Sequence, residues 1–275
     1  MKRRCLMSID VEDWFQVENL QRGIPRETWD VRELRVEQNV GTVLDLLASH
    51  GSRGTFFVLG WIAERFPHVI RKLHDAGHEI ASHGYGHELV YRMTKSRFLD
   101  DIAQSKKILE DIIGAPVAGY RAPNFSITEW AIDVLAQQGF RYDSSLFPAL
   151  AHDRYGKLES AAGKERGIFE LRPGFFQVPL SCVSVLGRNI PWAGGGYFRL
   201  YPYPVFRFGV RSILRREGIY CFYVHPWEFD PNQPRVAGIE AWYRFRHYNN
   251  LEKTKRRYTR LLEDFQFVPI CEVLP

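Results

Sequence analysis

The chain has 275 residues, of which 45% are hydrophobic and 25% are charged, so it can bury a large core without disulfides or a partner chain. This composition excludes fibrous, collagen-like and disordered proteins, and a net charge of +5 is too small to indicate a nucleic-acid partner. Aromatic residues make up 14% of the chain, more than its core requires, so we expect some of them at a ligand-binding surface.

The N-terminal half alternates between apolar runs of strand length and segments with helical periodicity. The predicted strands are residues 5–9, 55–59, 79–82, 117–120 and 140–142. The predicted helices are residues 36–50, 62–75, 96–113 and 128–138. This alternation predicts right-handed βαβ units and a parallel sheet or barrel, with functional residues at the C-terminal ends of the strands.

The rhythm becomes irregular between about residues 146 and 200, where Gly and Pro are scattered along the chain. We interpret this stretch as an insertion within one domain. Regular elements return as predicted helices over 205–216 and 251–264 and predicted strands over 219–224 and 265–270.

The cysteines and the N-terminal sequence indicate the cellular compartment of the protein. The four cysteines lie far apart and form no CxxC pair, which favours reduced thiols over a zinc knuckle or a redox site. The basic start of the chain is followed by an apolar stretch that ends at Asp10, and no run of about 20 apolar residues occurs. We therefore expect no signal peptide or membrane span and a cytoplasmic location, with any membrane contact at the inner face.

Two motifs at predicted strand ends carry metal-binding residue types. His83 and His87 lie four residues apart in SHGYGH, and the acidic run DVED spans Asp10 to Asp13. Two imidazoles and one carboxylate leave open positions on a divalent metal, as hydrolysis requires. The alternatives are a structural histidine pair and an acidic run that begins a helix. A two-His-one-carboxylate iron oxygenase would also fit this ligand set.

Three further strand ends carry polar residues. Arg121 and Asn124 lie in GYRAPN, Asp143 lies in YDS, and His225 lies in YVHPW. Each alone has an ordinary structural interpretation. Their joint position at successive strand ends favours one site assembled from distant segments, and an iron oxygenase would not need them.

These five blocks, in this order, resemble the five motifs of the NodB-homology polysaccharide deacetylases, carbohydrate esterase family 4. The segments SIDVEDWFQ, PWAGGGYFR, HPWEFD and RFRHYNNLEKTKRRYTRLLEDF resemble the branch with a C-terminal extension found beside exopolysaccharide and exosortase (PEP-CTERM) gene clusters. The resemblance implies an α/β fold, a distorted (β/α)7 barrel over residues 1–230, and a C-terminal extension over residues 231–275. It also implies one divalent metal, usually Zn²⁺, with Co²⁺, Ni²⁺ or Mn²⁺ as alternatives.

The resemblance further implies roles for the motif residues. His83 and His87 would bind the metal, and Asp10 would take a proton from metal-bound water. Arg121 would orient Asp10, and His225 would protonate the leaving amine.

Other positions are less closely determined. The resemblance implies that the backbone N–H of Asn124 helps to hold the oxyanion and that Asp143 supports the site, although Ser144 follows it where many members have Trp. Many members have two adjacent acids, whereas DVED offers Glu12 or Asp13 as the carboxylate ligand. Positions i and i+2 of a strand share a face, which favours Glu12. We expect Asp13, because its shorter side chain loses less freedom, and keep Glu12 as the alternative.

The expected substrate is an N-acetylated exopolysaccharide or its lipid-linked precursor. Trp192, Tyr197 and Trp227 are expected to line a sugar groove beside the glycine triplet 194–196, which would let the backbone approach a glycan; the alternative is an aromatic core under a long loop. The basic helix 251–264 is either a solvated face or a docking surface for anionic lipid or polymer. The rival functions are hydrolysis of small cyclic amides and glycan binding without catalysis.

Overall fold

The computed structural model describes residues 3–148, 156, 158–163 and 166–275, and all structural statements concern these residues. Part of the expected insertion, namely residues 149–155, 157 and 164–165, lies outside them.

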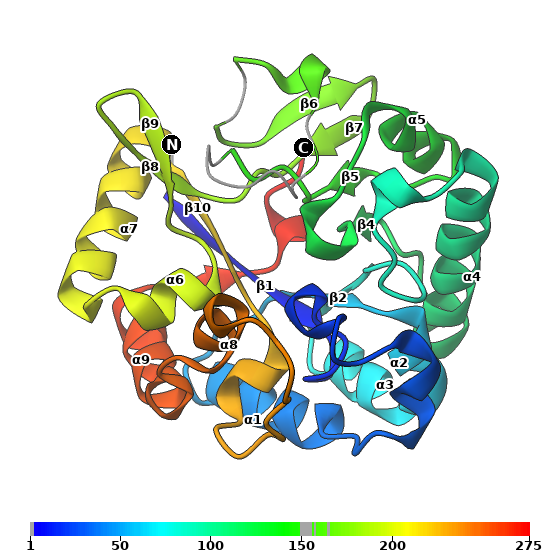
Figure 1. Cartoon of the computed structure of the whole chain (residues 1–275). Helices are drawn as coiled ribbons and strands as arrows, with labels where there is room; N and C mark the ends of the chain where they lie inside the picture. The colour runs from blue at the N-terminus through cyan, green and yellow to red at the C-terminus, as the bar shows by residue number, and fades with distance from the viewer. Residues whose placement is uncertain (1–2, 149–155, 157, 164–165) are drawn as a thin grey trace.

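A curled sheet forms the core of the fold (Figure 1), with nine strands in the described residues. Its order is β10 (Ile219–Val224), β1 (Arg4–Val11), β2 (Thr55–Val58), β3 (Glu79–Ser82), β4 (Gly119–Tyr120), β5 (Tyr142–Asp143), β7 (Phe175–Gln177) and β6 (Phe169–Arg172), and β11 (Phe267–Val268) also pairs with β1. All pairs are parallel except β6 with β7. The α/β distorted barrel expected from the resemblance is therefore confirmed, as an open sheet.

Helices surround this sheet (Figure 1). They are α1 (Val36–Ser49), α2 (Gly60–Arg65), α3 (Pro67–Asp75), α4 (Lys95–Ile113), α5 (Glu129–Gln137), α6 (Gly195–Leu200), α7 (Tyr203–Glu217), α8 (Ala241–Tyr248) and α9 (Leu251–Asp264). The helix predicted over 62–75 is two helices, because Pro67 lacks a backbone N–H to continue α2 and instead begins α3. Helix α8 was not predicted.

The expected insertion adds a small hairpin beside the main sheet. Its strands β8 (Cys182–Val185) and β9 (Arg188–Pro191) pair antiparallel. The chain then returns to the main sheet, where Gly194 forms an isolated parallel bridge with Tyr223 of β10.

The C-terminal segment packs closely on the rest of the fold. Strand β11 extends the main sheet at β1, and His247 of α8 stacks on Trp227 with ring centroids 4.2 Å apart. The amide nitrogen of Gln233 donates to the carbonyls of Trp227 and Asp230, so its oxygen accepts from Nε2 of His247 at 2.7 Å. Nε2 of His247 therefore carries a proton. The expected boundary at residue 230 stays a prediction.

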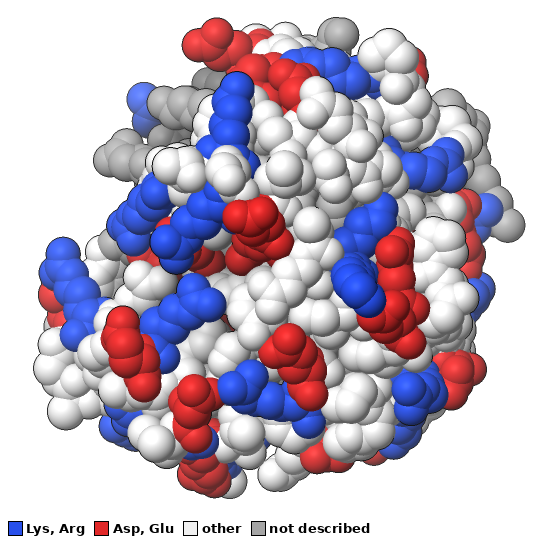
Figure 2. All heavy atoms as spheres, turned by 90° about the vertical axis from the view of Figure 1, so that its right-hand side faces the viewer, with Lys and Arg blue, Asp and Glu red and all other residues white. Residues whose placement is uncertain are grey.

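The surface carries charges of both signs. Figure 2 shows Lys and Arg interspersed with Asp and Glu over the face that includes α4. Ion pairs there include Lys107 with Asp111 and Arg97 with Glu88. None of the helices among the described residues combines the length and apolarity that a membrane crossing needs.

His247 generates a prediction about stability and pH. Burial lowers its pKa from 6.5 to about 3, so between these values the unfolded chain binds more protons than the folded one. Stability is therefore lost as the pH falls from about 6.5 towards 3. We expect His247→Asn to flatten the pH dependence of the unfolding free energy by up to about 1.4 kcal/mol per pH unit. Urea unfolding between pH 4 and 6 measures the slope of unfolding free energy against pH for the unaltered chain and for His247→Asn. Equal slopes would contradict the lowered pKa of His247.

Candidate active site

Three buried side chains that could bind a metal ion lie close together at the C-terminal ends of the central strands. Val11 of β1 pairs with Val58 of β2, which pairs with Ser82 of β3, so Glu12 and His83 directly follow aligned strand ends. Oε1 of Glu12 lies 3.1 Å from Nε2 of His83 and 3.0 Å from Nε2 of His87. Among the described residues, these three side chains form a group that could hold a metal ion, with ligand atoms within 4.8 Å of one another.

The tautomer of His83 suits metal binding. Its Nδ1 lies 2.7 Å from the backbone carbonyl of Arg121, which can only accept, so Nδ1 donates there and Nε2 is the ring nitrogen left to bind an ion beside Glu12. Two imidazole nitrogens and one carboxylate oxygen are ligands that zinc and similar divalent ions accept. The residues present therefore fit such an ion.

The charges in this cluster shift its pKa values. Burial alone would raise the pKa of Glu12, but the charges of His87 and His225 outweigh it and hold that pKa well below 4.5. Burial would likewise lower the pKa of His87, but the Glu12 carboxylate raises it. Glu12 is therefore a carboxylate that interacts favourably with cations.

Asp13, the expected ligand, lies outside this cluster. Its Oδ2 accepts hydrogen bonds from the backbone N–H groups of Arg35, at 2.8 Å, and Val36, at 3.0 Å, and its Oδ1 accepts from that of Trp14. Asp13 thus satisfies backbone donors at the start of α1. The geometry corrects our expectation in favour of Glu12.

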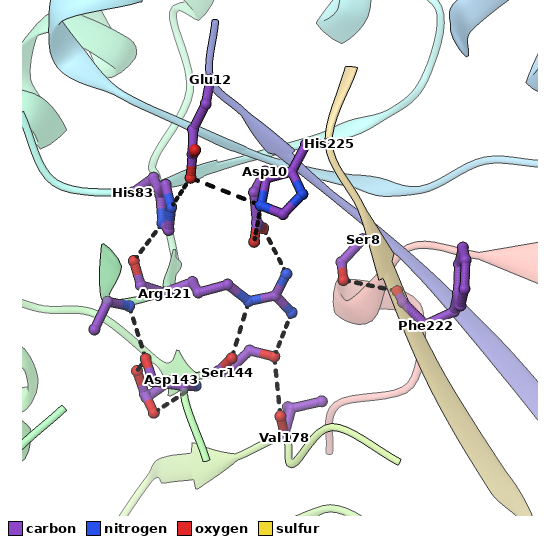
Figure 3. A network of polar contacts seen from close by, with 12 residues as sticks. Ser8, Asp10, Glu12, His83, Arg121, Asp143, Ser144, Val178, Phe222 and His225 are labelled. Carbon is purple, nitrogen blue, oxygen red and sulfur yellow. Dashed lines mark hydrogen bonds and ion pairs between the residues drawn. The ribbon is translucent and has the colours of Figure 1, made fainter. Parts of the chain in front are cut away.

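Arg121 connects the candidate base to the sheet (Figure 3). Its Nη1 donates to Oδ1 of Asp10 at 2.6 Å, while Nε and Nη2 donate to the backbone oxygen and the Oγ of Ser144, each at 2.9 Å. Ser144 in turn donates to the carbonyl of Val178. Ser144, which departs from the family pattern, therefore holds the guanidinium in place.

His225 lies beside Asp10 and Glu12, and Glu228 bonds to the opposite side of its ring. Its Nε2 is 3.9 Å from Oδ2 of Asp10 and 3.9 Å from Oε1 of Glu12, and its Nδ1 is 3.0 Å from Oε1 of Glu228. The other oxygen of Glu228 accepts from Nε of Arg199 at 2.8 Å. Burial opposes ionisation of Glu228, but Arg199 and His225 lower its pKa to about 2.

Glu228 and Arg199 were missed by the sequence analysis. The available signal was the spacing of His225 and Glu228 in HPWE, which places the two side chains next to each other in the turn η6 (Pro226–Phe229). Nothing in the sequence points to Arg199, which comes from α6.

The glycine triplet explains how Arg199 reaches this loop. A methyl group on Gly195 would lie 2.2 Å from the carboxylate oxygens of Glu228, and one on Gly194 would lie 2.5 Å from the Tyr223 hydroxyl. Gly194 and Gly195 therefore allow the start of α6 to approach Tyr223 and the His225 loop, whereas Gly196 lines the cavity. That the triplet lets a glycan approach the backbone stays a prediction.

Asp143 supports the site indirectly. Its carboxylate accepts from the Oγ of Ser145 at 2.5 Å and from the backbone N–H of Ser145 at 2.9 Å. That same Oγ accepts from the backbone N–H of Ala122, next to Arg121. Burial raises the pKa of Asp143 to about 6. Asp143 is therefore a positioning residue for the strand end that carries Arg121.

A cavity of about 550 Å³ opens over these residues. It is lined by Asp10, Glu12, His87 and His225, by Val17, Glu18, Asn19, Asn124, Phe125, Tyr223, Trp227 and Glu228, by Gly196, Tyr197, Arg199 and Leu200, and by Trp242, Tyr243, Phe245, Arg246 and Asn249. The last five come from the end of the chain and were not predicted.

The expected substrate-binding residues divide into two groups. Asn124, Tyr197 and Trp227 line the cavity, and Asn124 has a positive φ of 48°, a strained conformation that non-glycine residues often adopt at functional sites. Trp192 does not line it. Its ring stacks on Tyr201, 4.7 Å away, and its Nε1 donates to the carbonyl of Phe206. Trp192 therefore belongs to the core, the alternative we considered.

Comparisons with known sequences match a region that contains the SHGYGH and GYRAPN motifs. Residues 28–142 match the family model of polysaccharide deacetylase, and residues 144–275 match a domain of unknown function, DUF3473. A peptidoglycan deacetylase of Helicobacter pylori is 32% identical over 110 residues, which are 40% of this chain and 38% of that protein. A peptidoglycan-N-acetylglucosamine deacetylase of Bacillus cereus is 27% identical over 117 residues, 37% of this chain and 42% of that protein. The chain thus matches about two fifths of the length of these relatives.

Solved structures share the fold over the whole chain. A candidate polysaccharide deacetylase of Mycobacterium smegmatis superposes with a TM-score of 0.62 at 20% identity, over 99% of this chain and 90% of that one. A family 4 carbohydrate esterase pseudoenzyme of Bacillus anthracis superposes with a TM-score of 0.53 at 12% identity, over 100% of this chain and 66% of that one. At such identities the likeness concerns the fold alone. Taken with the family model over residues 28–142 and the named relatives, it confirms the resemblance of this chain to the NodB-type polysaccharide deacetylases, carbohydrate esterase family 4.

Proposed function

We propose that the chain is a metal-dependent hydrolase that removes N-acetyl groups from a polysaccharide or from its lipid-linked precursor. One observation carries the proposal: a single cavity contains the Glu12 and His87 side chains of the candidate metal cluster, the Arg121-bound carboxylate of Asp10, and His225. A binding module would not need a buried carboxylate and imidazole of this kind beside a metal cluster.

Glu12, His83 and His87 would hold the metal, which when bound supplies a Lewis acid that polarises the acetyl carbonyl and acidifies water. Asp10 acts as general base. Arg121 holds its Oδ1, so Oδ2 stays directed towards the cavity side occupied by His225.

His225 acts as general acid. Glu228 accepts the hydrogen bond from its Nδ1, which directs Nε2 towards Asp10 and Glu12. Burial alone would lower its pKa, but Glu12 and Glu228 raise it to about 9, so the ring carries the proton that the leaving amine requires at neutral pH. The backbone of Asn124 is proposed to help hold the oxyanion.

The finer assignments follow the same chemistry. We propose zinc, since it combines readily with two imidazoles and a carboxylate, and an exopolysaccharide substrate handled in the cytoplasm. Exposed cations on α9, including Lys253, Lys255 and Arg256, would favour contact with an anionic surface. Acetate release by the zinc-loaded protein from a panel of N-acetylhexosamine polymers tests the reaction. Ring opening of small cyclic amides, with no acetate release from any of these polymers, would replace this proposal with the rival hydrolase.

The ligand assignment predicts different effects of two neighbouring substitutions. Glu12→Gln removes the charged oxygen between two imidazoles, so we expect zinc affinity to fall at least about 100-fold. Even residues that only hydrogen-bond to metal ligands contribute about 10- to 100-fold to metal affinity. Asp13→Asn should leave zinc affinity unchanged. Competition with a fluorescent chelator measures both constants, and the reverse pattern would restore Asp13 as the ligand.

The proton-transfer roles predict loss of rate without loss of metal. Asp10→Asn and His225→Ala should each lower kcat/KM for acetate release by about 100- to 10,000-fold, the usual contribution of a general base or acid. Both variants should retain zinc at the level of the unaltered chain, measured by elemental analysis. Full activity in either variant would refute the mechanism.

The buried pair of Glu228 and Arg199 predicts a loss of both stability and rate. Glu228→Gln leaves the guanidinium of Arg199 buried without its counter-ion, which we expect to lower the unfolding free energy by roughly 3–5 kcal/mol. Glu240→Gln, in the exposed pair with Arg22, is the matched control and should cost under about 1 kcal/mol.

If Glu228 positions His225, the kcat of the Glu228→Gln variant should fall while its KM changes little. Equal effects of the two substitutions on stability, or an unchanged kcat for Glu228→Gln, would contradict this role.

A further inference from the structure

Helix α8 turns one of its faces towards the active-site cavity. Phe245 and Arg246 lie three and four residues after Trp242, and Asn249, directly after the helix, lies three residues after Arg246. This spacing places the four residues along one side of the helix, and all four line the cavity. The buried residue His247 lies on another side and packs against Trp227. Trp242 and Phe245 thus lie on a different side of α8 from His247, whose ring packs against the rest of the fold.

Two aromatic rings on this face remain open to solvent. Trp242 is 62% exposed and Phe245 is 48% exposed, and their rings stack on each other with centroids 6.0 Å apart and an interplanar angle of 20°. Large apolar side chains exposed beside a cavity indicate a binding surface. We call this pair of rings the aromatic shelf.

Hydrogen bonds to the backbone and to Tyr248 of α8 hold the helix that carries the shelf in place. Arg199 donates to the carbonyl oxygens of Arg246, His247 and Asn249 at the C-terminal end of α8. At the other side of the helix, the hydroxyl of Tyr248 accepts from the backbone N–H of Val236 at 3.0 Å. A ligand on the shelf would therefore meet a helix that is already ordered, which reduces the entropic cost of binding.

The active-site cavity continues past Tyr243 of α8. A second cavity of about 410 Å³ shares the lining residues Glu18, Asn19 and Tyr243 with the first and extends to Tyr91 and Arg92. Two adjoining cavities of this size provide more room than one N-acetylated sugar needs.

From the exposure of these two rings at the wall of the cavity we propose that the aromatic shelf is a subsite for sugar rings that flank the acetylated residue, so that the affinity for an extended glycan depends on Trp242 and Phe245. The inference rests on the proposed function. Sugar rings present C–H faces that stack on aromatic rings and hydroxyls that bond to polar side chains, and the shelf offers both, since Arg246 and Asn249 lie beside Trp242 and Phe245. The alternative occupant, a membrane, would be favoured by an uninterrupted apolar face.

Binding to an inactive protein tests the subsite separately from catalysis. The zinc-loaded Asp10→Asn protein is titrated calorimetrically with N-acetylglucosamine and with its hexamers in β-1,3, β-1,4 and β-1,6 linkage. We expect at least one hexamer to bind more tightly than the monosaccharide. Adding Trp242→Ala or Phe245→Ala should then weaken binding of that hexamer by about 2- to 12-fold per ring, without changing the affinity for the monosaccharide.

Phe208→Ala provides the matched control, because Phe208 on α7 is 68% exposed but does not line the cavity. It should leave the affinity for the hexamer unchanged. The proposal is overturned if no hexamer binds more tightly than the monosaccharide, or if Phe208→Ala weakens binding as much as the shelf variants do. It is also overturned if the shelf variants lose only their binding to phosphatidylglycerol vesicles.

These outcomes separate the two proposals. Hexamer binding that depends on the shelf, together with no acetate release by the unaltered chain, would refute the deacetylase function and retain the glycan subsite. Acetate release with the same kcat/KM for the monosaccharide and every hexamer would retain the deacetylase function and refute the glycan subsite.

Discussion

The buried guanidinium of Arg121 is the constraint on which the site depends. A cation without solvent exposure must be compensated, and here Asp10 supplies the opposite charge while Ser144 accepts two further hydrogen bonds. The ring of Phe57 lies 4.1 Å from the guanidinium carbon and covers it. The backbone carbonyl of Arg121 accepts a hydrogen bond from Nδ1 of His83 and so fixes the tautomer of that histidine. One residue thus orders both the candidate base and a candidate metal ligand.

This arrangement follows from parallel strands in register. Because β1, β2, β3 and β4 are neighbours in the sheet, the residues that follow them meet at one end. The sequence analysis could predict this much, since the alternation of strands and helices places His83, Arg121 and His225 at strand ends. It could not decide between Glu12 and Asp13, because that choice depends on how the chain turns after β1 and on the backbone donors of Arg35 and Val36.

The aromatic residues show a second limit of sequence patterns. Trp192 lies beside the glycine triplet in the sequence, yet its ring is buried between Tyr201 and Phe206, while Trp242 is exposed in a helix that periodicity did not reveal. Helix α8 combines aromatic and basic residues without a regular apolar stripe, so tertiary contacts from Arg199 determine its place. The excess of aromatic residues is therefore divided between the core and one wall of the cavity.

The second half of the chain, which matches DUF3473, completes a site that the first half begins. It contributes His225, the Glu228–Arg199 pair behind it, and the wall formed by α8. The match to the deacetylase model over residues 28–142 includes His87, Asn124 and Phe125 of the cavity lining but neither Asp10 and Glu12, which precede it, nor the residues that follow it.

Anomalous diffraction from crystals grown with zinc tests the central claim most directly, because it locates the ion independently of any activity. We predict one strong peak at the zinc edge, about 2.0–2.2 Å from Nε2 of His83, Nε2 of His87 and a carboxylate oxygen of Glu12. A peak bound to Asp13, or the absence of a peak at this cluster in zinc-saturated crystals, would contradict the account.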